Sequence, residues 1–109
     1  KVFAVEPSSS PILSEGIKGS HNVEGVGLGF VPNIYDDKLV DKVISIDETV
    51  ARKICKDLAK KEGIFCGTSS GMNVAAAIQI SKELGPKSRV VTVACDTGLK
   101  YLSEGLFDE

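Results

Sequence analysis

Two short runs of apolar, largely β-branched residues stand out in the first half of the chain, at Val2–Val5 and Val43–Ile46. Such runs are typical of strands, and Pro7 is expected to end the first one. The segment from Ile12 to Asp41 lies between them, is rich in glycine and shows no apolar period. Connections of this length inside a compact domain are usually functional or disordered, so we expect a long irregular segment of one of these kinds.

A helix is predicted directly after the second strand. From Asp47 to Lys61 the apolar residues recur every three or four positions, as they do on one face of a helix. Either Asp47 or a capping box made by Ser45 and Glu48 begins this helix. Gly63 is the predicted stop.

The second half of the chain predicts another helix and another strand. Ser69–Leu84 contains alanines that allow close packing, and Gly85-Pro86 ends this helix. The nearly all-apolar run Arg89–Cys95 predicts a strand that is buried on both faces. Asp96–Gly98 then forms a turn, and Tyr101-Leu102 begins a short terminal helix.

The order of these elements predicts an α/β fold with three layers (αβα) and a mostly parallel sheet. In such sheets, ligands bind beyond the carboxyl ends of the strands. The Gly67–Gly71 and Asp96–Gly98 turns are therefore candidates for one pocket. Small residues at Gly67–Gly71 leave backbone N–H groups at the start of a helix open to an electron-rich partner. Taken alone, such a turn is more often a simple helix cap.

Composition and charge narrow the classes of function. The 109 residues are 42% hydrophobic and 26% charged, which is typical of one soluble globular domain or part of one. A formal net charge of −2 gives no reason to expect nucleic acid or a membrane surface as a partner. No signal segment is recognisable, and Cys55, Cys66 and Cys95 match no zinc or redox spacing. We interpret these cysteines as buried free thiols, which favours the cytoplasm.

Four motifs occur in an order that carries a family resemblance. They are Val5-Glu6-Pro7, Glu24-Gly25-Val26-Gly27-Leu28-Gly29-Phe30-Val31-Pro32, Gly67-Thr68-Ser69-Ser70-Gly71 and Asp96-Thr97-Gly98-Leu99-Lys100-Tyr101-Leu102-Ser103. Together they resemble the carboxyl-terminal third of cysteine synthase (O-acetylserine sulfhydrylase), a fold-type II enzyme that depends on pyridoxal phosphate. The resemblance covers nearly the whole chain, and the ordered set is specific although each motif alone is weak.

The resemblance implies roles for the matched positions. Ser69 corresponds to the residue whose hydroxyl binds the pyridine nitrogen of the cofactor, and Gly67, Thr68 and Gly71 would shape the turn around it. Asp96 lies in a turn near the same edge of the ring. A carboxylate facing the nitrogen would change the electrostatics there, but we expect Asp96 to cap the terminal helix. The loop that the amino-acid substrate approaches corresponds to Gly25, Val26, Gly27 and Leu28.

The activity implied by the resemblance is synthesis of cysteine from O-acetylserine and sulfide, with loss of acetate and an α-aminoacrylate intermediate. A serine hydroxyl can donate to a neutral ring nitrogen but brings no negative charge, which suits β-elimination and limits side reactions. Two alternatives stay open. One is a β-replacement of the cystathionine β-synthase type, and the other is a truncated homologue that binds without catalysing.

Several parts of that family's active site are not recognisable in these residues. They are the Schiff-base lysine, the phosphate-binding loop and the asparagine loop for the substrate carboxylate. The chain also opens on strand-like residues without an initiator methionine, so we expect residues 1–109 to be the carboxyl-terminal portion of the domain and inactive alone. The resemblance further implies a homodimer and, in many members, a complex with serine acetyltransferase. The only histidine, His21, lies in a polar loop, where we expect it to be solvated.

Overall fold

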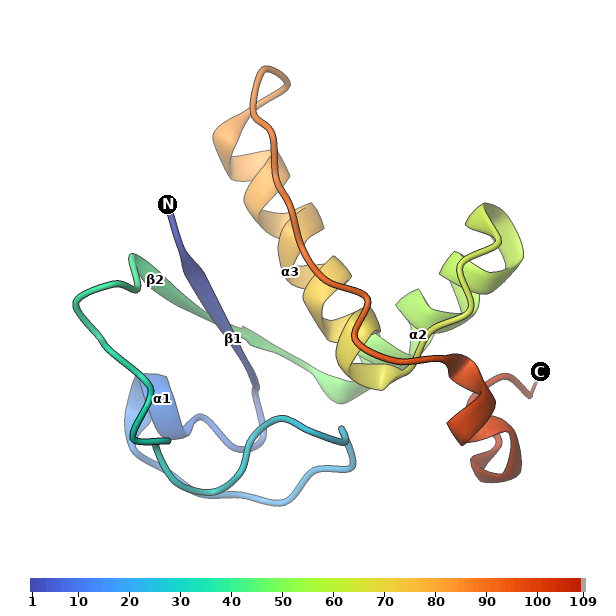
Figure 1. Cartoon of the computed structure of the whole chain (residues 1–109), viewed down its shortest axis with the longest axis horizontal. Helices are drawn as coiled ribbons and strands as arrows, with labels where there is room; N and C mark the ends of the chain where they lie inside the picture. Colours follow the sequence, from blue (N-terminus) through green and yellow to red (C-terminus); the bar gives the residue numbers. More distant parts are fainter. Residues whose placement is uncertain (109) are drawn as a thin grey trace.

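The structure is a computed structural model that describes residues 1–108. Figure 1 shows a strand pair on one side of a long helix and a second helix near the start of that helix. The elements in chain order are β1 (Phe3–Pro7), α1 (Ile12–Glu15), β2 (Lys42–Ile46), α2 (Glu48–Asp57), η1 (Leu58–Glu62), α3 (Thr68–Leu84) and η2 (Gly98–Glu104).

The two strands pair in parallel, with Val5 opposite Ile44 and Pro7 opposite Ile46. β1 includes Pro7 as its last residue. Proline has no backbone N–H, but at the end of a strand this N–H is not needed for pairing. The pairing continues one step further, where the Ser8 N–H donates to the Ile46 carbonyl at 3.0 Å. The predicted α/β class with a parallel sheet is confirmed.

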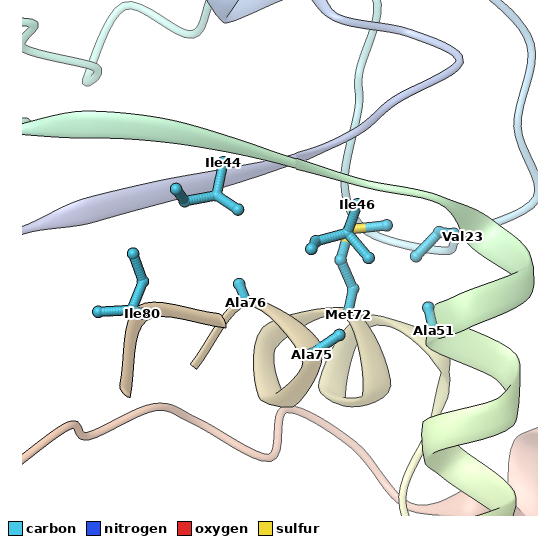
Figure 2. Packing of buried hydrophobic residues seen from close by; sticks show 8 residues of the cluster. All are labelled: Val23, Ile44, Ile46, Ala51, Met72, Ala75, Ala76 and Ile80. Carbon is cyan, nitrogen blue, oxygen red and sulfur yellow. The ribbon is translucent and has the colours of Figure 1, made fainter. Parts of the chain in front are cut away.

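The main core lies between the sheet and α3. Figure 2 shows its side chains meeting from four parts of the chain. They are Met72, Ala75, Ala76 and Ile80 of α3, Ile44 and Ile46 of β2, Ala51 of α2, and Val23 of the long connection. The small alanines let α3 approach the strands closely. The long connection, predicted to be irregular, begins with the short helix α1, and Val23 fixes one further point of it on the core.

The two long predicted helices are confirmed, and local signals set their ends; the short terminal helix is present as η2, which begins earlier than predicted, at Gly98. Asp47 is the cap of α2, since its carboxylate accepts from the Thr49 N–H at 2.7 Å. The last turn before Gly63 is a π-helix, η1, and Gly63 ends it in the left-handed conformation at φ 68°. α3 has 17 residues and ends at Gly85. No helix within residues 1–108 is long and apolar enough to cross a membrane.

The prediction of a buried strand at Arg89–Cys95 is wrong. This segment runs extended beside α3 (Figure 1) but forms no strand, and Val91 is 84% exposed. A strand needs a neighbouring backbone to pair with, and none lies beside this segment among the described residues. The single β-bridge in this region joins Cys66 to Thr97, further along.

Candidate functional site

The glycine turn and the Asp96 turn lie side by side. Gly67 is the cap residue of α3 and has an extended backbone, with φ −88° and ψ −177°. The antiparallel bridge between Cys66 and Thr97 holds the two turns together, and the Gly98 N–H donates to the Phe65 carbonyl at 3.2 Å. The structure thus brings together two of the segments that the sequence assigned to one pocket.

Gly67 is required by its neighbours. A Cβ at this position would collide with Asp96 Oδ1 and with the ring of Tyr101. Tyr101 is 1% exposed, and its hydroxyl donates to Asp96 Oδ2 at 2.8 Å. The close approach of these two side chains to the turn therefore depends on the missing side chain of Gly67.

Asp96 does not cap the terminal helix, contrary to expectation. The cap of η2 is Thr97, whose Oγ1 accepts from the Leu99 N–H at 3.4 Å. The Asp96 carboxylate turns toward Gly67 instead because Tyr101 holds one of its oxygens. Burial, together with the hydrogen bond to Asp96, raises the pKa of Tyr101 to about 12, so the phenol stays protonated and donating at neutral pH.

Two buried oxygens at this turn have no hydrogen-bond partner within residues 1–108. They are Thr68 Oγ1 and Asp96 Oδ1. Buried polar atoms are nearly always paired, so two unpaired oxygens beside one helix start point to a place for a polar group from outside these residues. Thr68 and Asp96 are both among the residues that the resemblance assigned to the cofactor.

The two serines of the turn have different environments. Ser70 is fully buried, and its Oγ accepts from the Cys95 N–H at 2.8 Å. Ser69 is 6% exposed, and its hydroxyl has no hydrogen-bond partner among the described residues. Ser70 is thus occupied in holding the 89–95 segment on α3, whereas Ser69 has a hydroxyl available for a ligand.

Gly71 lies against α2. A Cβ there would collide with the Ala51 carbonyl and with Cys55 Sγ. The Cys55 thiol donates to the Gly67 carbonyl at 3.0 Å, and burial and the neighbouring Cys66 raise its pKa to about 11. The packing of α2 against the start of α3 therefore supports the turn from behind. All three cysteines are free, as expected, but Cys95 is exposed rather than buried.

The predicted substrate loop is shaped by glycines. Gly25, Gly27 and Gly29 all have positive φ, at 82°, 57° and 81°. Val26 packs partly against the core, whereas Leu28 is 56% exposed. Every second residue from Gly25 to Gly29 therefore has a left-handed backbone conformation, which residues other than glycine rarely adopt.

His21 is partly exposed, and both of its ring nitrogens lie within hydrogen-bond distance of the loop backbone. Its Nε2 lies 2.8 Å from the Gly27 carbonyl oxygen, and its Nδ1 accepts from the Val23 N–H at 3.1 Å. Both hydrogen bonds are to the backbone of the same loop. The polar composition of this segment did not predict them.

A charged pair links Glu24, which directly precedes the predicted substrate loop, to the Asp96 turn. Lys100 Nζ lies 3.0 Å from Glu24 Oε1 and 3.8 Å from Asp96 Oδ2. The Glu24 carboxylate is the main cause that raises the pKa of Lys100. A cleft of about 430 Å³ opens here, lined by His21, Val23, Glu24, Arg52, Tyr101 and Glu104. Glu24, Lys100 and Tyr101 lie in the motifs noted above. No functional role could be predicted for them from the sequence.

Comparison with known proteins identifies the family. Residues 1–96 match the family described as pyridoxal-phosphate dependent enzyme. The chain belongs to this family. The cysteine synthase of Staphylococcus aureus strain Mu50 is 41% identical over 107 residues, which are 98% of this chain and 34% of that protein. The chain thus spans about a third of the length of the curated relatives that it matches.

Solved structures of the same family share the fold. The crystal structure of cysteine synthase from Entamoeba histolytica has a TM-score of 0.91 at 35% identity, and covers 100% of this chain and 32% of that one. The O-acetylserine-dependent cystathionine β-synthase from Helicobacter pylori has a TM-score of 0.90 at 34% identity, with coverages of 98% and 35%.

The residues at the turn fit pyridoxal phosphate. The ring of this cofactor carries a nitrogen that pairs with a hydroxyl or a carboxylate. The turn offers the Ser69 hydroxyl and two buried oxygens without partners, Thr68 Oγ1 and Asp96 Oδ1, while Tyr101 holds the other oxygen of Asp96. The start of α3 adds the positive end of a helix dipole. Within residues 1–108 no three side chains gather that could hold a metal ion.

Proposed function

We propose that residues 1–109 form the carboxyl-terminal portion of a cysteine synthase domain, and that the enzyme converts O-acetylserine and sulfide into cysteine and acetate. One observation carries the proposal: in a chain of the pyridoxal-phosphate family, the buried start of α3 presents a serine hydroxyl that nothing in the described residues occupies. The 41% identity to a cysteine synthase supports the choice of reaction.

Ser69 is the proposed partner of the cofactor ring. When bound, pyridoxal phosphate supplies the electron sink that allows the substrate to lose its β-acetoxy group. The Ser69 hydroxyl would hold the cofactor by donating to its ring nitrogen, and it would bring no full charge to the ring. Gly67 and Thr68 shape the floor, and Gly71 contributes by letting α2 pack behind it.

Asp96 gives this site a negative charge close to the same turn. Tyr101 holds one carboxylate oxygen at 2.8 Å, and the other is buried and unpartnered. We assign Asp96 to the polar edge of the cofactor pocket. Gly25, Val26, Gly27 and Leu28 are assigned to the wall along which the amino-acid substrate enters, with the exposed Leu28 on the outer side.

A second candidate differs only in the nucleophile. The structure from Helicobacter pylori is named an O-acetylserine-dependent cystathionine β-synthase, and its TM-score of 0.90 equals that of the O-acetylserine sulfhydrylase isoform 3 from Entamoeba histolytica. The name gives O-acetylserine as the donor, as in the first proposal. In a reaction of this type, homocysteine would be the nucleophile in place of sulfide. Assays with each nucleophile distinguish the two activities, and a protein that binds the cofactor but accepts neither would be the non-catalytic homologue.

We also propose a cytoplasmic homodimer that can bind serine acetyltransferase, as the family resemblance implies. The two buried reduced thiols, Cys55 and Cys66, support a reducing compartment. Sedimentation of the holoenzyme, alone and with the acetyltransferase, tests the assembly. A monomeric species that does not bind the acetyltransferase would count against this part of the proposal.

Ser69→Ala in the holoenzyme tests the proposed function, with Ser70→Ala as its matched control. We expect Ser69→Ala to keep the cofactor absorbance and to lose about 10²-fold in kcat for cysteine formation, because a preorganised donor is removed. Ser70→Ala should lower the free energy of unfolding by about 1 kcal/mol, because the Cys95 N–H loses its acceptor, and should affect kcat far less. Unchanged turnover in Ser69→Ala would refute the assignment.

A further inference from the structure

The imidazole of His21 makes two hydrogen bonds that fit only one tautomer. Nε2 faces the Gly27 carbonyl oxygen at 2.8 Å, and a carbonyl can only accept, so Nε2 carries a hydrogen. Nδ1 receives the Val23 N–H at 3.1 Å, so Nδ1 carries none. The ring is therefore the neutral Nε2–H form, with one donor and one acceptor both satisfied by the loop backbone.

These two bonds join a residue of the core to a glycine in the middle of the loop. Val23 is 2% exposed and packs in the main core, where Figure 2 shows it beside Ile46 and Ala51. Gly27 lies in the middle of the predicted substrate loop, with a positive φ of 57°. The imidazole thus ties the centre of the loop to the residue that anchors the loop on the core.

Gly27 is shaped to receive this ring. A Cβ at Gly27 would collide with His21 Nε2 and would lie 2.8 Å from Pro7 Cγ. At Gly25, by contrast, no atom lies within 4 Å of the place a Cβ would take. Of these two glycines, only Gly27 lies against other residues, the His21 ring and Pro7.

We infer that His21 is a positioning residue for the amino-acid substrate. By donating to Gly27 and accepting from Val23, it holds the Gly25–Leu28 loop in one conformation against the core. Both of its ring nitrogens are engaged by the loop backbone, so we assign it an effect on the substrate that acts through the loop. The inference rests on the proposed function for the identity of what the loop binds, but the link between His21 and the loop stands on the hydrogen bonds alone.

Three substitutions in the holoenzyme test this role. His21→Ala removes both bonds, and we expect KM for O-acetylserine to rise about tenfold, the effect of one lost hydrogen bond to the loop, with kcat and the cofactor absorbance little changed. A Gln amide nitrogen reaches the place of Nε2, so His21→Gln should recover most of the KM. An Asn amide reaches only the place of Nδ1, so His21→Asn should keep the Val23 bond and recover little.

Hydrogen exchange of the loop provides a readout that needs no activity. In wild type the Val23 amide and its neighbours should exchange slowly, and in His21→Ala the peptide over residues 22–30 should exchange at least tenfold faster, with Gln intermediate. Equal KM values and equal exchange across the set would overturn the inference. A wild-type enzyme that makes no cysteine while the exchange differences persist would overturn the proposed function and leave the loop assignment standing.

Discussion

At the scale of single residues, Tyr101 and Asp96 determine the polar character of the glycine turn. Tyr101 is buried, donates to Asp96 Oδ2, and has its pKa raised to about 12 by burial and by that bond. A tyrosine in the unfolded chain ionises near pH 10, so between pH 10 and 12 the unfolded state loses protons that the folded state keeps. The contribution of Tyr101 is therefore complete below pH 10 and is lost as the pH rises toward 12.

We predict that the free energy of unfolding decreases by about 2–3 kcal/mol from this cause between pH 10 and 12. Tyr101→Phe should lack this decrease, and at pH 8 should be less stable by about 1–2 kcal/mol because Asp96 loses its donor. Urea unfolding at pH 8, 10 and 11.5 measures both effects. Cys55, with a pKa of about 11, contributes equally to wild type and variant, so the difference between them isolates Tyr101. Parallel pH curves would contradict the assignment.

At the scale of elements, the contact of α2 with α3 depends on Gly71. In an exposed helix, Gly→Ala stabilises by about 1 kcal/mol, but here the added methyl group meets the Ala51 carbonyl and the Cys55 thiol. We predict that Gly71→Ala destabilises by about 1–3 kcal/mol and lowers cofactor affinity, because α2 must move away from the turn that it supports. Cys55→Ala in the same protein should rescue little, since the clash with the backbone carbonyl remains. Thermal unfolding and cofactor titration measure the two effects, and a stabilised Gly71→Ala would contradict this packing.

The same scale shows which features the sequence could predict. α2 and α3 follow from apolar period and from end signals such as Asp47 and Gly63, which act within a few residues. The buried strand at 89–95 did not form. The apolar run predicts that these residues are buried, but a strand also needs a neighbouring strand to pair with, and the sequence of the segment does not supply one. Likewise, Thr97 and not Asp96 caps η2, because the Asp96 carboxylate accepts a hydrogen bond from Tyr101, five residues further along the chain. The two hydrogen bonds of His21 could not be predicted from the sequence either, because they depend on the path of the loop.

At the scale of the whole molecule, a groove of about 380 Å³ with a mixed polar and apolar lining separates β1 from the extended segment after α3. Phe3 and Val5 line one side, Ala76 and Ile80 the floor, and Val90 the other side. The chain spans about a third of the relatives that it matches, and apolar side chains such as Val91 are open to solvent. An open groove between two extended backbones is suited to accept further strands in parallel.

This arrangement predicts a specific pattern of amide exchange in residues 90–95. Within residues 1–108 the N–H groups of Val90–Ala94 have no backbone acceptor, whereas the Cys95 N–H donates to Ser70 Oγ. In the isolated chain we expect residues 90–94 to exchange without protection and Cys95 to exchange slowly, with Ser70→Ala abolishing that difference. In the holoenzyme, residues 90–94 should become protected, because strands that fill the groove would supply the missing acceptors. Protection of Val91 and Val93 already in the isolated chain would mean that the segment pairs with itself or with a second copy.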